Sequence, residues 1–548
     1  MAVINGTPAG EPLSGTAGSD TITGAGGADT ITMLGGNDLS LWSLGDSSDI
    51  VEGGTGIDTA RFSSTNGFFN VSAASGKVFV AAGVGGAAEI VTLNDIEYLD
   101  LRTSAFFNTV AVGDLSGSDV TKVTVAFAGA NDSVAAHASS ANNTISVTTA
   151  GKNANITGLP TIFTVTNADA SDLVEVHGAN GNDKLSGATL GAGRIHLSLH
   201  GDDGNDSLTG SVNDDGLDGG TGNDTIIGGR GNDTVFLGSG NDLFLWSGGD
   251  GSDTIDGGAD FDIVRATGAN SDESFSVSAS TGAVVLARTA GLDSSALAME
   301  GVERLEIRTL GGADFVLLDK MTGSGVSVVA VDLAATAGGK TADTKVDTIR
   351  VGPDGGDDAI VLTLVGSKIM ISGLDADVSI DHAGKTDVMQ ILGGLGNDLI
   401  DASALPAGKI SLELNGNSSD DTIRGSAGND RVLDVGGSDS MSLGSGNDVV
   451  DWRNGAGDDL LEGGTGVDSL ILAANGESIA IGANGGRTLL TRNDGSSIDM
   501  DDVERIQFSA NTAAASLSVS NLTGTGVQLV AIDLGDPLGK SGNGKSEG

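Results

Sequence analysis

Residues 219–227 have the sequence Gly-Gly-Thr-Gly-Asn-Asp-Thr-Ile-Ile, and residues 228–236 repeat it as Gly-Gly-Arg-Gly-Asn-Asp-Thr-Val-Phe. Each nonapeptide places a glycine-rich turn before an aspartate and a short apolar stretch after it. Self-similarity at a fixed nine-residue period predicts a parallel β-solenoid, in which each repeat supplies one turn and one strand. A single copy would carry little weight in a chain with 89 glycines, so runs of copies in phase are the decisive feature.

The aspartates of these repeats form three runs. Successive aspartates are nine residues apart, except for one spacing of eleven that comes before the last repeat of every run. The first run comprises Asp20, Asp29, Asp38, Asp49 and Asp58, the second Asp206, Asp215, Asp224, Asp233, Asp242, Asp253 and Asp262, and the third Asp421, Asp430, Asp439, Asp448, Asp459 and Asp468. A low-complexity tract would not keep this phase.

The residue two positions after each aspartate tests the strand interpretation, because it should point into the core. It is apolar throughout the second and third runs, and in the first run only Ser40 is polar. A spacing of eleven adds two residues and therefore preserves the facing of the strand. It places Trp42, Trp246 and Trp452 on the inward face, which favours a ring that fills the core over a carbohydrate-stacking role.

The repeat supplies the ligands that calcium prefers. Ca²⁺ takes six to eight oxygens in a flexible geometry and accepts backbone carbonyls beside carboxylates. Glycines let the backbone turn with positive φ and present carbonyls without a Cβ in the way. With three-residue strands, two nonapeptides complete one coil, so aspartates two repeats apart stack on one edge. A lone Gly-Asn-Asp turn is better explained as a simple turn, but a stacked ladder of aspartates requires a cation.

These nonapeptides resemble those of the repeats-in-toxin (RTX) family of hemolysin-type calcium-binding proteins. The resemblance implies an all-β fold, in which parallel β-roll (β-solenoid) arrays of calcium-binding nonapeptides are separated by β-rich segments. It also implies that the aspartates of the three runs are the calcium ligands. Asp183 and Asp398 are interpreted as isolated extra copies.

Some repeats have weaker support as calcium sites. The terminal turns of each array are expected to have no stacked partner beyond them, which makes Asp58, Asp262 and Asp468 the ligands with the least support. Asp439 follows Asp434-Val435-Gly436-Gly437-Ser438, which lacks the first two glycines of the repeat, and it is expected to bind poorly.

The composition limits the partners. The net charge is −47, from 74 acidic and 27 basic residues, which argues against nucleic acid or an anionic membrane as a partner. About 12 inter-turn sites filled by divalent ions would neutralise roughly half of this charge. Without calcium, charge repulsion and the high glycine content predict disordered arrays. The chain has no cysteine, so calcium is the expected staple for an extracellular fold.

The ends of the chain bear on export. Residues 1–6 show neither a basic region nor an apolar core, so no cleavable signal peptide is expected, and no apolar run is long enough to insert in a membrane. The RTX resemblance implies secretion by a type I route, independent of a signal peptide. The tail, residues 542–548, does not resemble a type I secretion signal, which suggests a truncated C-terminus or another route.

The chain divides into arrays and intervening segments. The arrays are predicted at 1–62, 206–265 and 421–472, and connecting segments at 63–130 and 266–345. β-rich segments with an isolated turn are predicted at 131–205 and 346–420, and a β-rich C-terminal segment at 473–548. Motifs such as Ile96-Glu97-Tyr98-Leu99 recur at 302–305 and 503–506, which indicates tandem units of roughly 205 to 215 residues. Whether these segments continue the solenoid or cap it stays open.

Catalytic motifs are scarce. His196 and His200 share a strand face, but surface histidines are a simpler interpretation than a zinc pair. The Gly544–Gly548 match to a nucleophile elbow lacks a strand-to-helix context, and no phosphate-binding loop is complete. An enzyme is therefore not expected.

Two function classes remain. One is a secreted calcium-binding protein with a structural or adhesive role at the cell exterior, in a surface layer, matrix or adhesin, with self-assembly or a cell-surface polysaccharide as its partner. The other is the non-catalytic repeat portion of a larger secreted enzyme or toxin.

Overall fold

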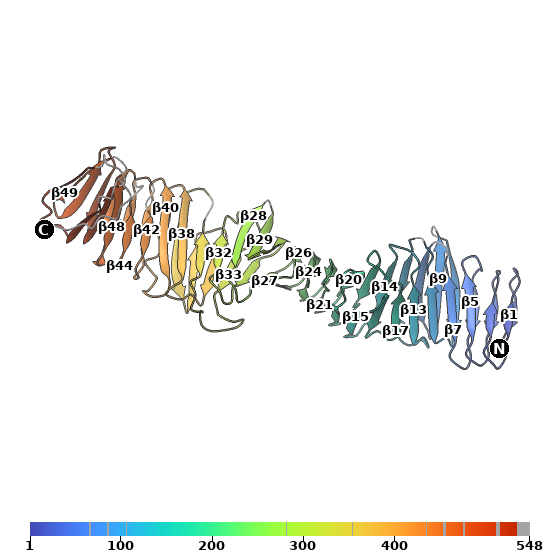
Figure 1. The fold of residues 1–548 in the computed structure, drawn as a ribbon. Coiled ribbons are helices and arrows are strands. Elements are labelled where there is room, and N and C mark those ends of the chain that lie inside the picture. The colour runs from blue at the N-terminus through green and yellow to red at the C-terminus, as the bar shows by residue number, and fades with distance from the viewer. Residues whose placement is uncertain are drawn as a thin grey trace. The chain divides into compact units, whose positions relative to one another are not determined.

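The computed structural model describes residues 1–64, 67–84, 87–105, 107–280, 282–352, 355–433, 436–452, 456–474, 477–510 and 516–533. Within these residues the regular elements are β-strands, with no α-helix and thus no helix that could cross a membrane. The chain forms two compact units, Met1–Val264 and Arg265–Gly548. In each unit the strands stack one after another as the rungs of a solenoid (Figure 1).

The first unit contains two sheets that face each other. In stacking order, one sheet comprises β1 (Val3–Asn5), β3 (Thr21–Thr23), β5 (Leu39–Ser43), β7 (Thr59–Ser63), β11 (Tyr98–Arg102), β13 (Lys122–Ala126), β17 (Ile162–Thr166), β16 (Asn153–Thr157), β15 (Thr144–Ala150), β19 (Lys184–Thr189), β21 (Ser207–Thr209), β23 (Thr225–Ile227) and β25 (Leu243–Ser247). The other comprises β2 (Pro12–Ser14), β4 (Thr30–Thr32), β6 (Ile50–Glu52), β10 (Ala87–Asn94), β9 (Lys77–Val84), β8 (Phe68–Ala74), β12 (Thr109–Val112), β14 (Ser133–His137), β18 (Leu173–His177), β20 (His196–His200), β22 (Gly216–Asp218), β24 (Thr234–Ser239) and β26 (Asp253–Ala259).

The second unit repeats this plan. One of its sheets comprises β31 (Arg304–Arg308), β33 (Val328–Asp332), β37 (Asp377–Asp381), β36 (Lys368–Ser372), β35 (Ala359–Val365), β39 (Leu399–Asp401), β41 (Thr422–Arg424), β43 (Ser440–Ser442), β46 (Asp458–Glu462), β51 (Ser497–Asp501), β50 (Arg487–Arg492), β49 (Ser478–Asn484) and β53 (Ser516–Val519). The other comprises β30 (Asp293–Glu300), β29 (Ala283–Ala290), β28 (Ser274–Ser280), β32 (Phe315–Leu318), β34 (Thr348–Val351), β38 (Val388–Leu395), β40 (Ser411–Ser418), β42 (Arg431–Leu433), β45 (Val449–Asp451), β48 (Ser469–Ala474), β52 (Arg505–Ala510) and β54 (Leu529–Asp533). A short parallel pair, β44 (Ser445–Gly446) and β47 (Thr465–Gly466), joins two turns, and β27 (Ile263–Thr267) spans the boundary between the units.

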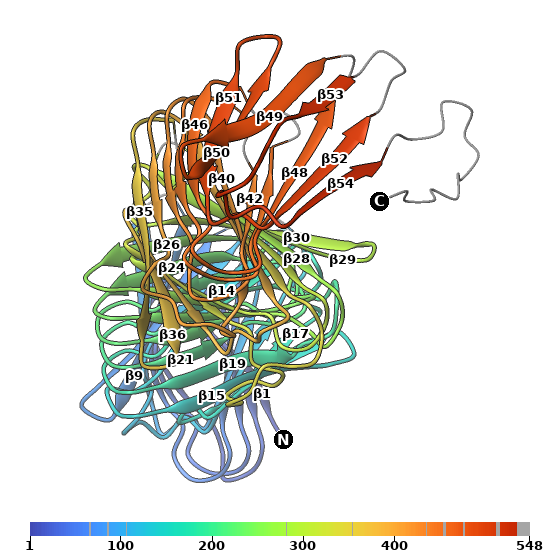
Figure 2. The ribbon, with the colours of Figure 1, turned by 90° about the vertical axis from the view of Figure 1, so that its left-hand side faces the viewer.

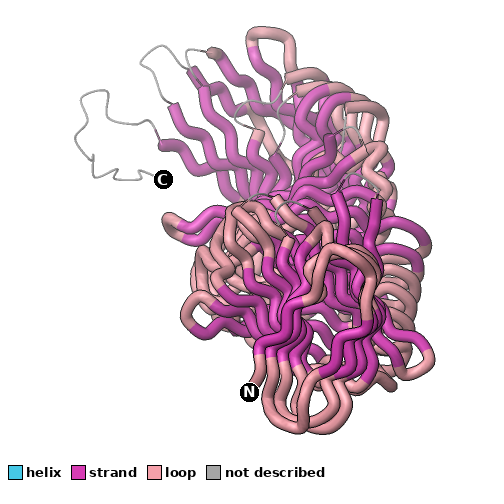
Figure 3. Tube along the Cα trace, turned by 90° about the vertical axis from the view of Figure 1, so that its right-hand side faces the viewer, coloured by secondary structure: helices cyan, strands magenta, loops and turns pink. Residues whose placement is uncertain are grey.

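The strand pairings confirm the predicted coil. Ser207 pairs with Thr225 and Thr225 with Leu243, so parallel neighbours are 18 residues apart and two nonapeptides complete one turn of the solenoid. Consecutive strands therefore alternate between the two sheets, and loops join them at the edges (Figure 3). The predicted all-β parallel β-roll is confirmed.

The intervening segments continue the solenoid with longer rungs, which the sequence left open. Tyr98 of β11 pairs with Thr59 of the first array on one side and with Lys122 of β13 on the other. Three-stranded antiparallel excursions interrupt this parallel order. They are formed by β8–β10, β15–β17, β28–β30, β35–β37 and β49–β51, and several of their labelled strands can be followed in Figure 2.

The core lies between the two sheets of each unit. Every residue two positions after an array aspartate is buried, including Ser40. The three tryptophans are at most 4% exposed, so their inward placement is confirmed. Trp42 and Trp246 donate their Nε1–H to backbone carbonyls of Ser47 (2.9 Å) and Gly251 (3.2 Å). A buried indole with its polar atom satisfied is a stable way to fill a core.

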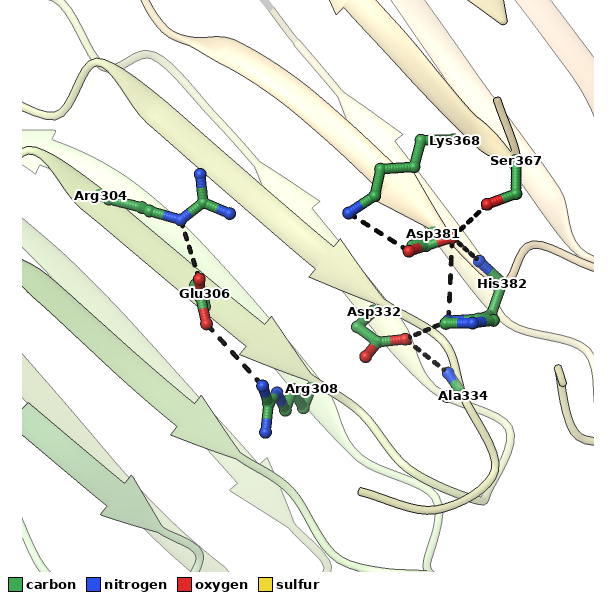
Figure 4. A network of polar contacts seen from close by, with 9 residues as sticks. All are labelled: Arg304, Glu306, Arg308, Asp332, Ala334, Ser367, Lys368, Asp381 and His382. Carbon is green, nitrogen blue, oxygen red and sulfur yellow. Dashed lines mark hydrogen bonds and ion pairs between the residues drawn. The ribbon is translucent and has the colours of Figure 1, made fainter. Parts of the chain in front are cut away.

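The outward face carries ion pairs within strands and between neighbouring strands. On β31, Glu306 lies between Arg304 (2.8 Å) and Arg308 (4.0 Å). Asp381 binds Lys368 at 3.2 Å, and Nδ1 of His382 lies 2.7 Å from Asp332 (Figure 4). The basic residues at this place are thus paired with acidic partners on the sheet surface.

We expect Trp246→Ala to lower the midpoint of urea unfolding in saturating calcium, with a loss of about 3–5 kcal/mol for a buried tryptophan. Phe236→Ala is the control, because Phe236 is 50% exposed; its expected cost is about 1 kcal/mol or less. Far-UV circular dichroism during urea titration measures both. Equal midpoints for the two variants would contradict a core role for Trp246.

Candidate calcium sites

Each array aspartate lies where a turn meets a strand, directly before the strand in most repeats and within its first two residues at Asp253 and Asp459. Asp224, for example, precedes β23, and Asp233 precedes β24. All 18 aspartates predicted as ligands are buried, with Asp439 the most exposed at 5%. The odd and even members of a run lie on opposite edges of the solenoid, because consecutive strands belong to opposite sheets.

One oxygen of most array carboxylates accepts a hydrogen bond from the preceding coil, whereas Oδ1 of Asp215 and of Asp430 accepts from a serine hydroxyl of its own turn. The backbone N–H of Asp206 donates to Oδ1 of Asp224 (2.7 Å), and that of Asp224 donates to Oδ1 of Asp242 (2.6 Å). On the other edge the same bond runs from Asp215 to Asp233 and from Asp233 to Asp253, both at 2.9 Å. The aspartates therefore form two continuous ladders along the solenoid, one carboxylate per coil.

The other oxygen of most ladder carboxylates has no hydrogen-bond donor. Among the described residues, a buried Oδ2 without a partner is found in Asp29, Asp38, Asp58, Asp183, Asp206, Asp224, Asp233, Asp242, Asp253, Asp398, Asp421, Asp448 and Asp468. An ionised oxygen buried without a partner is costly, and a bound cation removes that cost. This pattern fits the donor chemistry of calcium.

The turn glycines leave room for oxygens to converge. A Cβ on Gly219 would lie 2.5 Å from Oδ2 of Asp224 and 2.3 Å from the carbonyl oxygen of Leu237 in the next coil. These two oxygens are therefore no more than about 5 Å apart, a gap that a cation with Ca–O distances of about 2.3–2.6 Å can bridge. Gly222 has φ of +122° and lies against the carbonyl of Gly204, so this close stacking requires glycine.

The oxygens that converge between stacked turns come from the backbone as well as from side chains. Within the described ranges, no group of three or more His, Cys, Asp or Glu side chains is arranged to hold a metal ion. Each turn contributes one carboxylate, so the remaining ligands of a calcium ion would be carbonyl oxygens of stacked turns. Calcium accepts such mixed coordination.

Four array aspartates differ because hydrogen bonds also occupy their second oxygen. Oδ2 of Asp20 accepts from Thr16 (2.6 Å), that of Asp430 from the N–H of Ser426 (2.5 Å), and that of Asp215 from the N–H of Ser211. Nε1–H of Trp452 donates to Oδ2 of Asp459 at 2.6 Å. These four carboxylates therefore depend less on a cation than do the carboxylates whose Oδ2 has no donor.

A ladder of asparagines lies beside the aspartate ladder that contains Asp224, and its hydrogen bonds point in the opposite direction along the solenoid. The N–H of Asn223 donates to Oδ1 of Asn205 and the N–H of Asn241 to Oδ1 of Asn223, both at 2.7 Å. The aspartate N–H groups point toward the next coil, whereas these asparagine N–H groups point toward the previous one. The two ladders together hold each turn to both of its neighbours.

Stacking raises the proton affinity of the carboxylates. Burial raises the pKa of Asp224 to about 7, and the carboxylates of Asp242 and Asp206 add to the effect. Burial raises the pKa of Asp233 to about 8, with Asp253 and Asp215 adding to it. Without a cation, protons therefore compete for these positions near neutral pH.

Two expectations require correction. Asp183 and Asp398 are not isolated copies, because their N–H groups donate to Oδ1 of Asp206 (2.6 Å) and of Asp421 (2.8 Å). They extend the second and third arrays by one coil, at a spacing of 23 residues. Both residues carry the Gly-Asn-Asp triplet of the repeats. They were separated from the arrays in the sequence because they do not follow the nine-residue period.

The expectation that terminal turns lack a partner is wrong for two arrays. The N–H of Asp58 donates to Oε2 of Glu97, and the N–H of Asp468 donates to Oε2 of Glu504, both at 2.7 Å. These glutamates belong to the recurring Ile/Val-Glu motif, whose role the sequence did not reveal. A glutamate thus continues the ladder by one coil where the rung lengthens.

Asp439 occupies a regular place in its ladder despite its atypical turn. Its Oδ1 accepts from the N–H of Asp421 (2.8 Å), and its own N–H donates to Asp459 (2.9 Å). The substituted residues of that turn, Asp434 and Val435, lie outside the described residues. How well Asp439 binds calcium stays a prediction.

The histidines form a stack instead of a chelating pair. His196 and His200 share the outward face of β20, as expected. The rings of His137, His177 and His200 stack across three strands, with centroids 4.3 and 4.4 Å apart. Parallel stacked rings direct their nitrogens side by side, and His177 and His200 each lie 3.4 Å from an aspartate, Asp202 and Asp218.

A family model agrees with this geometry. A model of the RTX calcium-binding nonapeptide repeat, built of four copies, matches residues 5–39, 198–225, 211–244, 247–270, 415–450 and 455–474. No curated protein matches the chain. Among solved structures, the extracellular lipase LipA from Serratia marcescens matches with 18% identity and a TM-score of 0.14, over 53% of this chain and 38% of the lipase chain. The chain thus spans less than half of that structure, and a TM-score this low supports no inference.

The fold and the ladders define a calcium-binding parallel β-roll. Its arrays are RTX calcium-binding nonapeptide repeats, so the chain is a calcium-binding repeat protein of the type that is typically secreted.

We expect Asp253→Ala to raise the calcium concentration needed for folding by about tenfold, which corresponds to about 1.4 kcal/mol of binding free energy. This substitution removes both a ladder acceptor and a buried bare oxygen. Asp256→Ala on the same strand is the matched control, since Asp256 is exposed and outside the ladder. Calcium titrations followed by circular dichroism measure the midpoints. Equal midpoints would show that Asp253 is no ligand.

In calcium-free buffer we expect β-structure to increase as the pH falls from 8.5 to 5. The folded-state pKa of Asp224, Asp233 and Asp448 is raised to about 7 or 8, above the unfolded value, so the folded chain binds more protons in this range. This proton-linked stability is present at acidic pH and is lost as the pH rises through 7 to 8. Circular dichroism after removal of calcium on a chelating resin tests the sign, and a decrease in β-structure on acidification would contradict it.

Proposed function

We propose that the chain has a structural or adhesive role at the cell exterior, as a component of a surface layer, a matrix or an adhesin, and that it folds when it binds calcium outside the cell. The observation that carries this proposal is the continuity of the rungs within each unit. Array strands pair in register with the strands of the intervening segments, so the calcium turns and the longer rungs form one stack.

Continuity makes calcium a requirement of the whole stack. In a solenoid, each repeat gains stability mainly from its neighbours. Arrays of three-residue strands have few backbone hydrogen bonds, and their buried carboxylates repel one another without a cation. Ions in the arrays would therefore stabilise the longer rungs that stack on them, which suits a building element of the exterior.

Two cavities among the described residues are smaller than a usual substrate pocket, which supports a non-catalytic role. A cavity of about 170 Å³ is lined by residues such as Lys320 and Asp358, and another of about 220 Å³ by residues such as Ile481 and Ser520. Pockets for small-molecule substrates usually measure about 300–1,000 Å³. Hollows of this size favour contacts with extended partners over an enclosed reaction.

The charge favours particular partners. A net charge of −47 disfavours nucleic acid and anionic lipid, while calcium ions can bridge acidic surfaces. Other copies of this chain, or a cell-surface polysaccharide, are the partners that fit. We further propose export by a type I route, because a chain that stays unfolded at cytosolic calcium can be threaded through a channel.

Electron microscopy with and without millimolar calcium tests the assembly. Sheets or fibres that form with calcium and dissolve in chelator are the expected result, and co-sedimentation with purified cell-surface polysaccharide tests adhesion. A chain that folds on calcium but stays monodisperse and binds no polysaccharide would overturn the structural role. It would favour the alternative, the repeat portion of a larger secreted enzyme or toxin.

Folding itself should require calcium. Each site holding calcium at ~10 times its dissociation constant adds about 1.4 kcal/mol, so a dozen sites exceed the usual stability of a domain. We expect coil-like circular dichroism in chelator at pH 8 and a β-spectrum at millimolar calcium. Magnesium at the same concentration is the control, because its octahedral preference suits these turns poorly. Unchanged β-structure in chelator would contradict calcium-dependent folding.

A further inference from the structure

Asp314 occupies a ladder position outside the nonapeptide repeats. It closes the turn Gly311-Gly312-Ala313-Asp314 before β32, in a segment that the RTX repeat model does not match. Glu273 precedes the neighbouring strand β28 on one side, and Asp347 precedes β34 on the other. All three acidic residues are at most 4% exposed.

The hydrogen bonds around Asp314 reproduce those of the calcium arrays. The N–H of Glu273 donates to Oδ1 of Asp314, and the N–H of Asp314 donates to Oδ1 of Asp347, both at 2.9 Å. The next bond runs from Asp347 to Asp387 at 3.2 Å. Oδ2 of Asp314 is buried and has no donor, as in most array aspartates.

The charged group and the N–H donors nearest to Asp314 are bound to other partners. Glu273 forms an ion pair with buried Arg288, so its charge is already balanced. The N–H of Gly312 donates to Asp343 at 3.0 Å and that of Ala313 to Asp272 at 2.9 Å, so neither is available to Asp314.

A second buried oxygen in the same turn is also unpaired. The hydroxyl of Thr309 is fully buried and has no hydrogen-bond partner. Thr309 stands five residues before Asp314, the position that the first glycine of the nonapeptide holds relative to its aspartate. The turn thus contains two oxygens that lack a donor.

The first unit shows how the same position is satisfied without an ion. Asn108 precedes β12 and lies between the coils of β8 and β14, as Asp314 lies between those of β28 and β34. Gly67 donates to Oδ1 of Asn108 (3.3 Å), and the N–H of Asn108 donates to Oδ1 of Asp132 (2.9 Å). The side-chain amide of Asn108 then donates to Ser104 (3.2 Å) and to Asp132 (3.0 Å).

The hydroxyl that is unpaired in the second unit is also bonded in the first. Thr103 stands five residues before Asn108 and donates to Oδ2 of Asp132 at 3.1 Å. The first unit thus fills this ladder position with N–H and O–H donors, where the second presents a carboxylate oxygen and an unpaired hydroxyl. At this position only the second unit leaves a buried carboxylate oxygen without a donor.

We propose that the turn ending at Asp314 binds a calcium ion, which takes the carboxylate of Asp314 and the hydroxyl of Thr309 among its ligands. The donors are all oxygens on a loop edge, which suits a hard divalent cation and calcium above magnesium. The inference rests on the calcium-dependent folding proposed above. It adds a site that lacks the nonapeptide pattern and belongs to the second unit alone.

Anomalous diffraction from crystals of the full chain grown in calcium tests the site directly. We expect a calcium peak beside Oδ2 of Asp314 and none beside Asn108. Array peaks without a peak at Asp314 would overturn this inference and leave the proposed function intact. A folded chain without any calcium peak would overturn both.

Two reciprocal substitutions test the inference in solution. Asp314→Asn installs the residue that the first unit uses and should fold, with one calcium ion fewer per chain. Asn108→Asp should create a second site of this kind and bind one ion more. Equilibrium dialysis against radioactive calcium should thus separate the two variants by two ions per chain. Equal counts would overturn the proposal.

Discussion

A buried carboxylate with one oxygen hydrogen-bonded and the other without a donor is the element on which most coils of the arrays depend. The bonded oxygen fixes the side chain against the preceding turn, so it cannot rotate out to water. The other oxygen has no hydrogen-bond donor, so a positive charge at a defined place between turns would stabilise it. Glycines around it keep carbonyl oxygens within reach, as the contacts of Gly219 with Asp224 and Leu237 show. We therefore expect folding and ion binding to be one event in these arrays.

The arrays could be predicted almost completely from the sequence, because a fixed period ties residue number to position in the coil. Apolar residues such as Ile226 and Phe244 reached the core, and the edges on which Asp224 and Asp233 lie followed from the two-repeat coil. Where rungs lengthen, the period breaks. The bond from Asp183 to Asp206 spans 23 residues and that from Asp58 to Glu97 spans 39, so no sequence period identified these partners.

The side chain at a ladder position is satisfied by different partners along the chain. A tryptophan N–H satisfies the second oxygen at Asp459, and the side-chain amide of Asn108 replaces that oxygen with a donor, whereas at Asp224 the oxygen is unpaired and a cation would bind there. Only the chemistry of the side chain changes, since the backbone N–H to Oδ1 bond is kept. Glu97 and Glu504 could not be predicted from the spacing of aspartates. Their longer side chains accept the N–H of Asp58 and of Asp468 from a different turn.

The strand lengths bear on how such a molecule carries load. Hydrogen bonds between stacked strands run along the stacking direction, so tension in that direction pulls on one interface after another. Interfaces of three-residue strands such as β23 have the fewest backbone bonds, whereas β11 and β13 pair over five residues. Ions that join adjacent turns reinforce the interfaces that are weakest in backbone bonds. The calcium concentration would therefore set the tensile strength of the arrays, which would yield first once calcium is removed.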